Sequence, residues 1–412
     1  MQSMRPTVES CSAPDSQLRA AVVGLSASRI SGVRDHATLL AGALQRHGVP
    51  CEWHWLMRSD TSLRGARSEI RKWARRLAGE LRRSRPDVIV WHYSVFDYAH
   101  RGVPLYVAPV LSALRATGTP VIALLHEMAY PWRRAGWRGA VWALTQRAAL
   151  IDVMRSLSAA IVTAGFRADW LGSRRWVARR PLAVAPVFSN LPPPSTRAGG
   201  SLHAGTVGVF GYAYESVSTA LVLDAMRVVA EGGREVALRL LGAPGRSSPA
   251  GQEWLREAQT RGLAGAMSFT GPLPAQELSD ALAACQVLVF PDAAGASSRK
   301  GSLAAALASG RPVVAIDGPQ SWPAMSERGA LLLVPAQARA LGDGVAHLLG
   351  DRSAADQLGA RGRAFHEQEM SADVTAAAVV RLLEQVGVGH SACATAPPHE
   401  GPADSQRERA ER

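Results

Sequence analysis

The sequence predicts an α/β protein made of two Rossmann-like domains, each built on a parallel sheet. The chain has 412 residues, and since roughly 100–200 residues per domain is usual, this length suits two domains. Short, continuously apolar segments alternate with segments that have the apolar spacing of helices, which is typical of βαβ units. The Pro- and Gly-rich residues 191–201 (LPPPSTRAGGS) break this alternation, and it restarts after them. We therefore expect two domains facing each other across a cleft.

The first predicted domain, residues 18–190, contains strands that are apolar at every position, as in a sheet covered on both faces. Strands are expected at 20–25, 51–56, 87–92, 120–126 and 159–164. Helices are expected at 35–46, 68–83 and 105–116, with further long helical segments between 126 and 159.

The second predicted domain, residues 202–370, repeats the pattern after the linker at 191–201. Strands are expected at 206–211, 236–242, 267–270, 287–290, 312–316 and 331–334. Helices are expected at 217–231, 252–261, 277–284, 300–309, 336–349 and 353–368. A last helix, 372–386, lies in the segment 371–387, which we expect to pack back on the first domain. Residues 388–412 mix Pro, Ala and charges and are expected to form a disordered tail.

Composition excludes several classes of protein. Hydrophobic residues make up 47% of the chain, too many for a protein that is mainly disordered. The four cysteines are scattered without a C-x-x-C pair, which excludes a disulfide framework or a Cys-rich zinc module and suits a reducing compartment. The most apolar stretches are interrupted by charges, and the first 17 residues have no apolar core. We expect a cytoplasmic protein without a signal peptide.

A basic loop follows the predicted strand 287–290 and is the most specific candidate site. Parallel sheets bind ligands at the carboxyl ends of their strands. Here Ser298, Arg299, Lys300, Gly301 and Ser302 open a helix, whose free N–H groups and partial positive charge suit a phosphate. The chain has only two lysines, and one of them is in this loop. The alternative is an ordinary helix start with two solvated basic side chains.

The stretch 301–315 (GSLAAALASGRPVVA) resembles the donor-binding signature of the family 4 GT-B glycosyltransferases. Residues 31–48, 206–211 and 269–292 also resemble that family, and the resemblance covers about residues 20–385. It implies a GT-B fold that holds a nucleoside diphosphate sugar in the cleft, gripped mainly by the second domain, and transfer with retention of configuration.

The sequence departs from the family pattern at two points. The family's Glu-x7-Glu pair falls on Ser297 and Ala305, so both carboxylates are missing. The Arg and Lys that usually follow the first strand of the second domain are absent from residues 211–216 (GYAYES). We interpret the chain as a variant branch in which Arg299 and Lys300 supply the charge that holds the diphosphate.

The resemblance implies further site residues in both domains. His126 ends the fourth predicted strand, where the family often has a His near the transferred sugar; a core histidine is the alternative. Its neighbours Glu127 and Tyr130 are weaker candidates. Backbone contacts to the donor are implied at Gly32, Gly211 and Gly271, where a glycine in a tight turn is the plainer interpretation.

The resulting hypothesis is a glycosyltransferase that moves a sugar from a nucleoside diphosphate sugar to a hydroxyl of a glycan, a lipid-linked glycan or a small molecule, in polysaccharide or glycoconjugate biosynthesis. The sequence has no Asp-x-Asp and no recognisable metal site, so we expect no cofactor and metal-independent transfer. The alternatives are a catalytically silent GT-B partner subunit and another GT-B enzyme, such as a sugar-nucleotide epimerase or a phosphorylase.

Two regions combine basic and aromatic residues. Ten Lys and Arg residues lie between positions 58 and 85, and a second basic region, 133–180, is interleaved with tryptophans. Nothing resembles a nucleic-acid-binding module, so we expect no nucleic acid partner. An anionic membrane surface, reached as a peripheral protein on the inner face of the cell membrane, is one interpretation; a solvated Arg-rich surface is the other.

Overall fold

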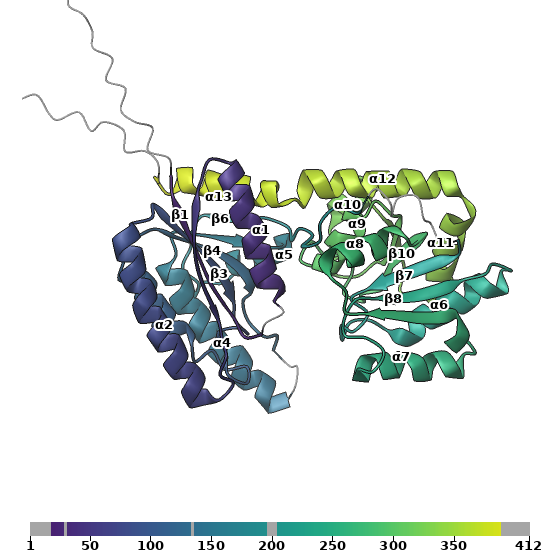
Figure 1. The fold of residues 1–412 in the computed structure, drawn as a ribbon, viewed down its shortest axis with the longest axis horizontal. Coiled ribbons are helices and arrows are strands. Elements are labelled where there is room, and N and C mark those ends of the chain that lie inside the picture. Colours follow the sequence, from purple (N-terminus) through teal and green to yellow (C-terminus); the bar gives the residue numbers. More distant parts are fainter. Residues whose placement is uncertain (1–17, 29–30, 133–135, 196–203, 389–412) are drawn as a thin grey trace, which may run out of the picture.

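Two parallel six-stranded sheets, one in each half of the chain, form the framework of the molecule (Figure 1). The computed structural model describes residues 18–28, 31–132, 136–195 and 204–388. The linker prediction is therefore covered only up to residue 195, and the predicted tail lies outside the described residues apart from its first residue. The prediction of two parallel-sheet α/β domains is confirmed.

The first sheet has the strand order β2-β1-β3-β4-β5-β6. Its strands are β1 (Ala20–Ser26), β2 (Cys51–Met57), β3 (Val88–Ser94), β4 (Val121–Glu127), β5 (Ala159–Val162) and β6 (Leu182–Val184). The short strand β6 was not predicted, because it has only three residues and none of them is fully buried. The fourth strand ends at Glu127, one residue beyond the predicted end at His126.

Helices cover both faces of the first sheet. The helices are α1 (Gly32–Arg46), α2 (Leu63–Ser84), α3 (Val107–Arg115), α4 (Gly136–Ser156) and α5 (Gly165–Gly172). One apolar core joins the sheet to α2, α3 and α4, and a second core on the opposite face joins it to α1. Because both faces are covered, the strands are apolar at successive positions, as the sequence indicated.

The second sheet has the strand order β12-β11-β10-β7-β8-β9. Its strands are β7 (Thr206–Phe210), β8 (Ala237–Leu241), β9 (Met267–Gly271), β10 (Val287–Phe290), β11 (Val313–Ile316) and β12 (Leu332–Val334). The helices are α6 (Thr219–Glu231), α7 (Pro249–Thr260), η2 (Ala264–Ala266, a 3-10 turn), α8 (Ala275–Ala283), α9 (Gly301–Ala308), α10 (Pro323–Glu327), α11 (Ala338–Gly350), α12 (Arg352–Glu369) and α13 (Ala372–Gln385). One core lies under α6, α7 and α11, and another under α8 and α9.

The chain crosses between the domains twice. Residues 185–195 lead from the first sheet to the second domain, where the Ser195 hydroxyl and N–H both donate to the Asp280 carboxylate on α8. At the end of the second domain α12 runs along one side of it, and α13 continues in the same direction onto the first domain (Figure 1). Helix α13 completes the core beneath α1, and Asp373 of α13 pairs with Arg46 of α1. The two domains are thus joined through residues 185–195 and through helix α13.

Within the described ranges, none of the helices has the length and apolarity needed to span a bilayer.

Candidate functional site

The strand orders place a crevice at the carboxyl edge of each sheet. In the first sheet the order reverses between β1 and β3, and in the second it reverses between β7 and β10. Helices that follow these neighbouring strands leave on opposite faces, and the space between them at the strand ends is where such sheets bind ligands. The predicted phosphate loop follows β10, and Gly211 follows β7, so both flank the second crevice.

Lys300 is the N-cap residue of α9, and its charge is held by a buried carboxylate. Its Nζ lies 2.7 Å from Oδ2 of Asp292, whose side chain is almost fully buried, and 4.6 Å from the centre of the Tyr214 ring. Burial alone would raise the pKa of Asp292, but hydrogen bonds from Lys300, from the Ala294 N–H and from Ser216 outweigh it and lower that pKa. The sequence analysis expected Lys300 to be available for phosphate, whereas its charge is already balanced here.

Arg299 points the other way, toward the first domain. Its Nη1 lies 3.5 Å from Oε1 of Glu127, and its Nε donates to Gln320 at 3.3 Å. The other oxygen of Glu127 accepts from Arg167 Nη2 at 2.9 Å. Arg167 is buried, and it also donates to the backbone carbonyl of His126. Glu127 therefore connects one guanidinium of its own domain to one of the second domain.

The first turn of α9 lies close to the backbone of Gly211. Lys300 makes no side-chain cap, so the first N–H groups of α9 are not occupied by a capping side chain. Gly211 has a φ of +82°, and a Cβ there would come within 3.1 Å of Ser302 Oγ and 2.6 Å of Tyr214 Cε2. Only glycine allows this approach. The hydroxyl of Ser302 is buried and has no hydrogen-bond partner among the described residues.

Ser298 and Gly301 are in contact with the first domain. The Ser298 hydroxyl donates to the Thr163 carbonyl at 2.9 Å, and the Ser298 carbonyl accepts from the Val187 N–H at 2.8 Å. A Cβ on Gly301 would lie 3.8 Å from Val187. Ser298, which the sequence analysis expected to bind the sugar donor, thus links the two domains to each other. Gly301 lies at the same contact between the domains.

The two remaining predicted glycines lie at different edges of the cleft. The Gly32 carbonyl, at the start of α1, accepts from the Asn190 side chain at 3.0 Å, so this loop is tied to the connecting residues 185–195. Gly271 ends β9 with a φ of +68°, and nothing lies within 4 Å of the position of a Cβ. Its backbone is beside Gly242 and Gly245, in the loop after β8. Gly271 is therefore separated from the phosphate loop by the loops that follow β7 and β8.

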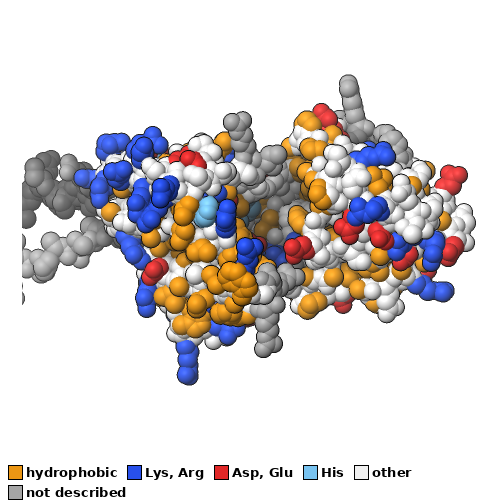
Figure 2. All heavy atoms as spheres, turned by 90° about the horizontal axis from the view of Figure 1, so that it is seen from below, with side chains coloured by type: hydrophobic (Ala, Val, Ile, Leu, Met, Phe, Trp, Pro, Cys, Tyr) orange, Lys and Arg blue, Asp and Glu red, His pale blue; other side chains and the backbone are white. Residues whose placement is uncertain are grey.

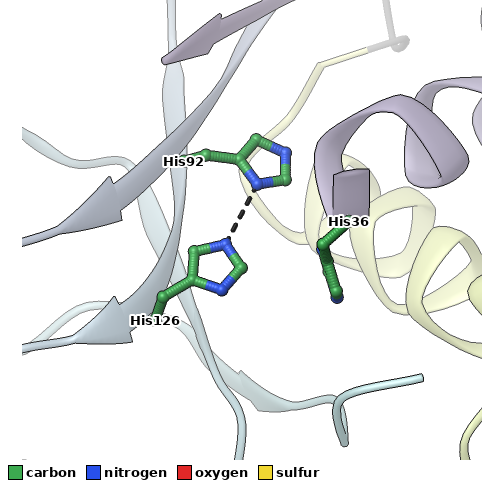
Figure 3. Close-up of side chains that lie close together, drawn as sticks. All are labelled: His36, His92 and His126. Carbon is green, nitrogen blue, oxygen red and sulfur yellow. Dashed lines mark hydrogen bonds between the residues drawn. The ribbon is translucent and has the colours of Figure 1, made fainter. Parts of the chain in front are cut away.

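His126 lies beside two other histidines rather than alone (Figure 3). Its Nε2 is 3.1 Å from Nδ1 of His92, near the end of β3, and its ring centre is 5.0 Å from that of His36 on α1. Burial and the nearby Arg167 charge lower the pKa of His126 to about 3. Burial and the other rings of the group also hold the pKa values of His36 and His92 well below the usual value. All three imidazoles are therefore neutral near pH 7.

A cavity of about 430 Å³ opens between the domains beside Glu127. It is lined by Arg299 and Gln320 from the second domain and, from the first, by Phe96, Glu127, Met128, Ala129, Tyr130, Pro131, Arg147, Phe166, Arg167 and Trp170. Its wall in the first domain is mostly aromatic and apolar, whereas its second-domain side is polar. Glu127 and Tyr130, the weaker candidates of the sequence analysis, line this cavity, and His126 does not.

The sequence analysis missed several residues of this region. His92 occupies the same kind of position as His126, near the carboxyl end of an apolar strand, and that signal could have found it. His36 is in the first two turns of α1 on its buried face. Asp292 lies two residues after the end of β10, but nothing in the sequence indicates that its partner would be Lys300, eight residues later. The role of Arg167 depends on how α5 packs against β4, which is a tertiary contact.

Comparisons with known proteins agree with this arrangement. Residues 203–351 match the family model "Glycosyl transferases group 1". The structure of HepE from Anabaena, solved with UDP and glucose, superposes with a TM-score of 0.62 at 16% identity, covering 89% of this chain and 99% of that one. Sucrose-phosphate synthase from Thermosynechococcus elongatus superposes with a TM-score of 0.62 at 16% identity over 90% of this chain and 99% of the other. WaaG, a glycosyltransferase involved in lipopolysaccharide biosynthesis, superposes with a TM-score of 0.60 at 13% identity, covering 88% of this chain and 99% of that one.

The chain has the GT-B fold. The coverage of nearly the whole length of each neighbour shows that the likeness extends over both domains. The family model lies on the second domain and contains the phosphate loop and α9. At these identities the likeness establishes the fold, while UDP and glucose remain ligands of the neighbour. A sequence comparison with curated proteins gave no match.

Proposed function

We propose that this GT-B protein is a glycosyltransferase that moves a sugar from a nucleoside diphosphate sugar to a hydroxyl group, with retention of configuration and without a metal ion. The observation that carries the proposal is the crevice between β7 and β10. Here the uncapped N-terminus of α9 and the buried Ser302 hydroxyl lie next to the backbone of Gly211, which has no side chain. The crevice is in the domain that matches the glycosyl transferase model. The UDP bound to HepE supports the same ligand class.

In the proposed site the dipole and the N–H groups at the start of α9 contribute more to diphosphate binding than unpaired basic side chains do. Three cations, Arg167, Arg299 and Lys300, face two carboxylates, Asp292 and Glu127, which leaves one net positive charge. Lys300 stays on Asp292 and orients the loop. Arg299 has the weaker partner, because its 3.5 Å contact is to a carboxylate that is about two-fifths exposed. A diphosphate would compete with Glu127 for Arg299, and charge-assisted hydrogen bonds of this kind are about twice as strong as neutral ones.

The transfer step needs no protein nucleophile. The bond from the anomeric carbon to the diphosphate oxygen breaks, the acceptor oxygen forms a bond on the same face, and the acceptor proton goes to the departing phosphate. The N-terminus of α9 and Arg299 stabilise the charge that develops on the leaving group. His126, neutral and partly exposed beside the crevice of the first sheet, would contact the transferred sugar.

The acceptor is expected to enter the aromatic cavity of the first domain. Phe96, Phe166 and Trp170 offer flat apolar faces, and Glu127 and Tyr130 offer polar groups on the same wall. Pockets of this kind bind ligands through an apolar lining and a few polar groups that fix orientation. This combination suits a sugar ring or a lipid-linked glycan.

The test is transfer and donor hydrolysis by the purified chain with a panel of UDP- and GDP-sugars, detected by release of the nucleoside diphosphate. We expect release from one donor class and release that is at least about tenfold slower in the variant Arg299→Ala, which removes a charged contact to the leaving group. Absence of release with every donor, despite nucleotide binding, would favour the catalytically silent partner subunit instead.

We also propose that the first domain docks on an anionic membrane at the inner face of the cell. Figure 2 shows basic side chains and a broad hydrophobic area on this domain. The side chains of Trp132, Trp137 and Leu144 are 50%, 76% and 63% exposed. The guanidinium of Arg138 lies 5.8 Å from the Trp137 ring, and that of Arg147 lies 4.5 Å from the Trp132 ring. Trp137, Arg138 and Leu144 lie on α4, and exposed aromatic and basic side chains on one helix are typical of interfacial binding.

Co-sedimentation with phosphatidylserine-containing vesicles tests the docking proposal. The chain should bind these vesicles, not neutral ones, and should be released near 1 M salt, where the Debye length is about 3 Å. Trp137→Ser and Leu144→Ser should weaken binding. The control Leu39→Ser removes an exposed apolar side chain from α1, on the other face of the sheet, and should not weaken binding. Equal binding to neutral vesicles would contradict the proposal.

A further inference from the structure

The histidines His36, His92 and His126 converge at one point of the first domain although they are far apart in the sequence (Figure 3). One ring nitrogen from each lies within 4.8 Å of the others. The ring centres of His92 and His126 are 5.3 Å apart, and that of His36 is 5.9 and 5.0 Å from them. No other group of three His, Cys, Asp or Glu side chains in the described part of the chain is brought together in this way.

The convergence follows from the strand order. His92 is paired with Leu124 on β4, and His126 lies two residues further, so both side chains leave the sheet on the same face. Helix α1 covers this face, and His36 is on its buried side. The three rings thus come from β3, from β4 and from the helix that follows β1, and they surround the crevice of the first sheet, where its order reverses.

Two of the ring nitrogens are buried without a partner. His36 is 3% and His92 is 1% exposed, and neither Nδ1 of His36 nor Nε2 of His92 makes a hydrogen bond within the described residues. Buried polar atoms are almost always paired, so each such nitrogen calls for an explanation. Phe188 stacks on the His36 ring at 3.9 Å and holds it in place. A cation bound to Nδ1 of His36 would supply the partner that this nitrogen lacks, whereas Nε2 of His92 stays without one, because His92 would bind through Nδ1.

We propose that His36, His92 and His126 form a binding site for Zn²⁺ or a similar imidazole-preferring divalent cation, with a fourth position left for water. Tetrahedral zinc with Zn–N bonds of about 2.0–2.1 Å places ligand nitrogens about 3.3 Å apart. The separation of His92 Nδ1 and His126 Nε2 is 3.1 Å, close to this spacing, and both rings would turn so that their lone pairs point at the ion instead of at each other. Three histidines with one open position is a known zinc geometry.

Binding of the cation moves a proton within one imidazole ring but does not change the charge of any ring. In the absence of metal, one of the two nitrogens in the His92–His126 hydrogen bond carries the proton. When both nitrogens bind the cation, that proton moves to the other nitrogen of its own ring, and both imidazoles stay neutral. Burial already favours the neutral rings, which is the form that coordinates metals.

Occupation of the site has a consequence for the proposed transferase. A metal-bound His126 could not contact the transferred sugar, so zinc should inhibit transfer and a chelator should not. This consequence rests on the proposed function, whereas the binding itself does not. Hard cations such as Mg²⁺ prefer oxygen ligands and should neither bind here nor inhibit.

The experiment is titration of the full chain with Co²⁺, followed by the visible absorption of tetrahedral cobalt, and with Zn²⁺ by calorimetry. Wild type should bind one ion per chain. Because loss of an outer-shell partner already costs about 10- to 100-fold in affinity, loss of a ligand in His36→Gln, His92→Gln or His126→Gln should cost at least about a hundredfold. His347→Gln, at an exposed position on α11, is the matched control and should bind like wild type.

Circular dichroism of each variant shows that it is folded, and the partly exposed His126 is the position at which Gln is best tolerated. Absence of cobalt absorption in folded wild type, or unchanged affinity in folded His126→Gln, would overturn the metal site whether or not the chain transfers sugar. Zinc binding without any turnover of a sugar donor would instead support the metal site and contradict the proposed transferase function.

Discussion

The ion pair of Lys300 with Asp292 allows a prediction of how much stability the second domain loses when Lys300 is removed. Asp292 is 0% exposed, and its Oδ2 is 2.7 Å from Lys300 Nζ. Lys300→Ala would leave a buried carboxylate with only the Ala294 N–H and Ser216 as partners. Removal of one partner of a buried pair costs about 3–5 kcal/mol, and because two hydrogen bonds remain we expect the low end, about 3 kcal/mol. For a domain of this size that is a fall of about 6–12 °C in Tm.

The sign of the pH dependence follows from the pKa of Asp292. In wild type that pKa is lowered, so the carboxylate stabilises the fold above its unfolded-state pKa, and this contribution is lost as the pH falls through the folded-state pKa. Without Lys300 the pKa should be higher than in wild type, because only the Ala294 N–H and Ser216 then oppose the effect of burial. The cost of Lys300→Ala should therefore be largest at pH 7 and should shrink as the pH is lowered toward 4.

Urea unfolding of the second domain, measured at pH 7 and near pH 4, tests this. Arg339→Ala is the control, because its i,i+4 pair with Asp343 is exposed and worth less than about 1 kcal/mol. The double variant Lys300→Met with Asp292→Asn should recover most of the loss, since no unpaired charge is left. A Lys300→Ala variant as stable as Arg339→Ala at pH 7 would refute the reasoning.

Three further outcomes are expected. Gly211→Ala should destabilise the second domain by about 2 kcal/mol by thermal unfolding, because its Cβ meets Tyr214 and Ser302 and its φ is positive; unchanged stability would contradict this. Arg299→Ala should change stability by less than about 1 kcal/mol in the same assay, since its partner Glu127 is partly exposed. His126→Gln should keep a hydrogen-bonding group near His92 and fold normally, yet lower kcat by about tenfold or more; full turnover would make His126 only structural.

The sequence predicted most strands to within two residues because the buried strands are continuous apolar runs. It predicted less well where local signals are weak. Helix α2 begins at Leu63, five residues before its predicted start, since its first two residues are exposed and Gly65 follows them. The short elements β6 and α10 have too few residues to show a period. Helix α9 begins at Gly301, one residue after its predicted start, because the backbone of its N-cap Lys300 is extended.

The candidate site could be predicted only in part, since its contacts join distant segments. The position of the phosphate loop after β10 was readable from the apolar run and the basic residues. The contact of Arg299 with Glu127 of the other domain could not be predicted, because it depends on how the two domains are positioned relative to each other. The convergence of His36 and His92 on His126 depends on the strand order, which the sequence does not specify.

Nucleotide binding tests the central claim most directly. Titration calorimetry of wild type with UDP and with GDP should show one of them binding at one site per chain. In Arg299→Ala the loss of a charge-assisted contact, about 1.5–3 kcal/mol, should weaken that binding by roughly ten- to a hundredfold, while Arg339→Ala should bind like wild type. No binding of either nucleotide by folded wild type, or equal binding by Arg299→Ala, would contradict the assignment of this cleft as the donor site.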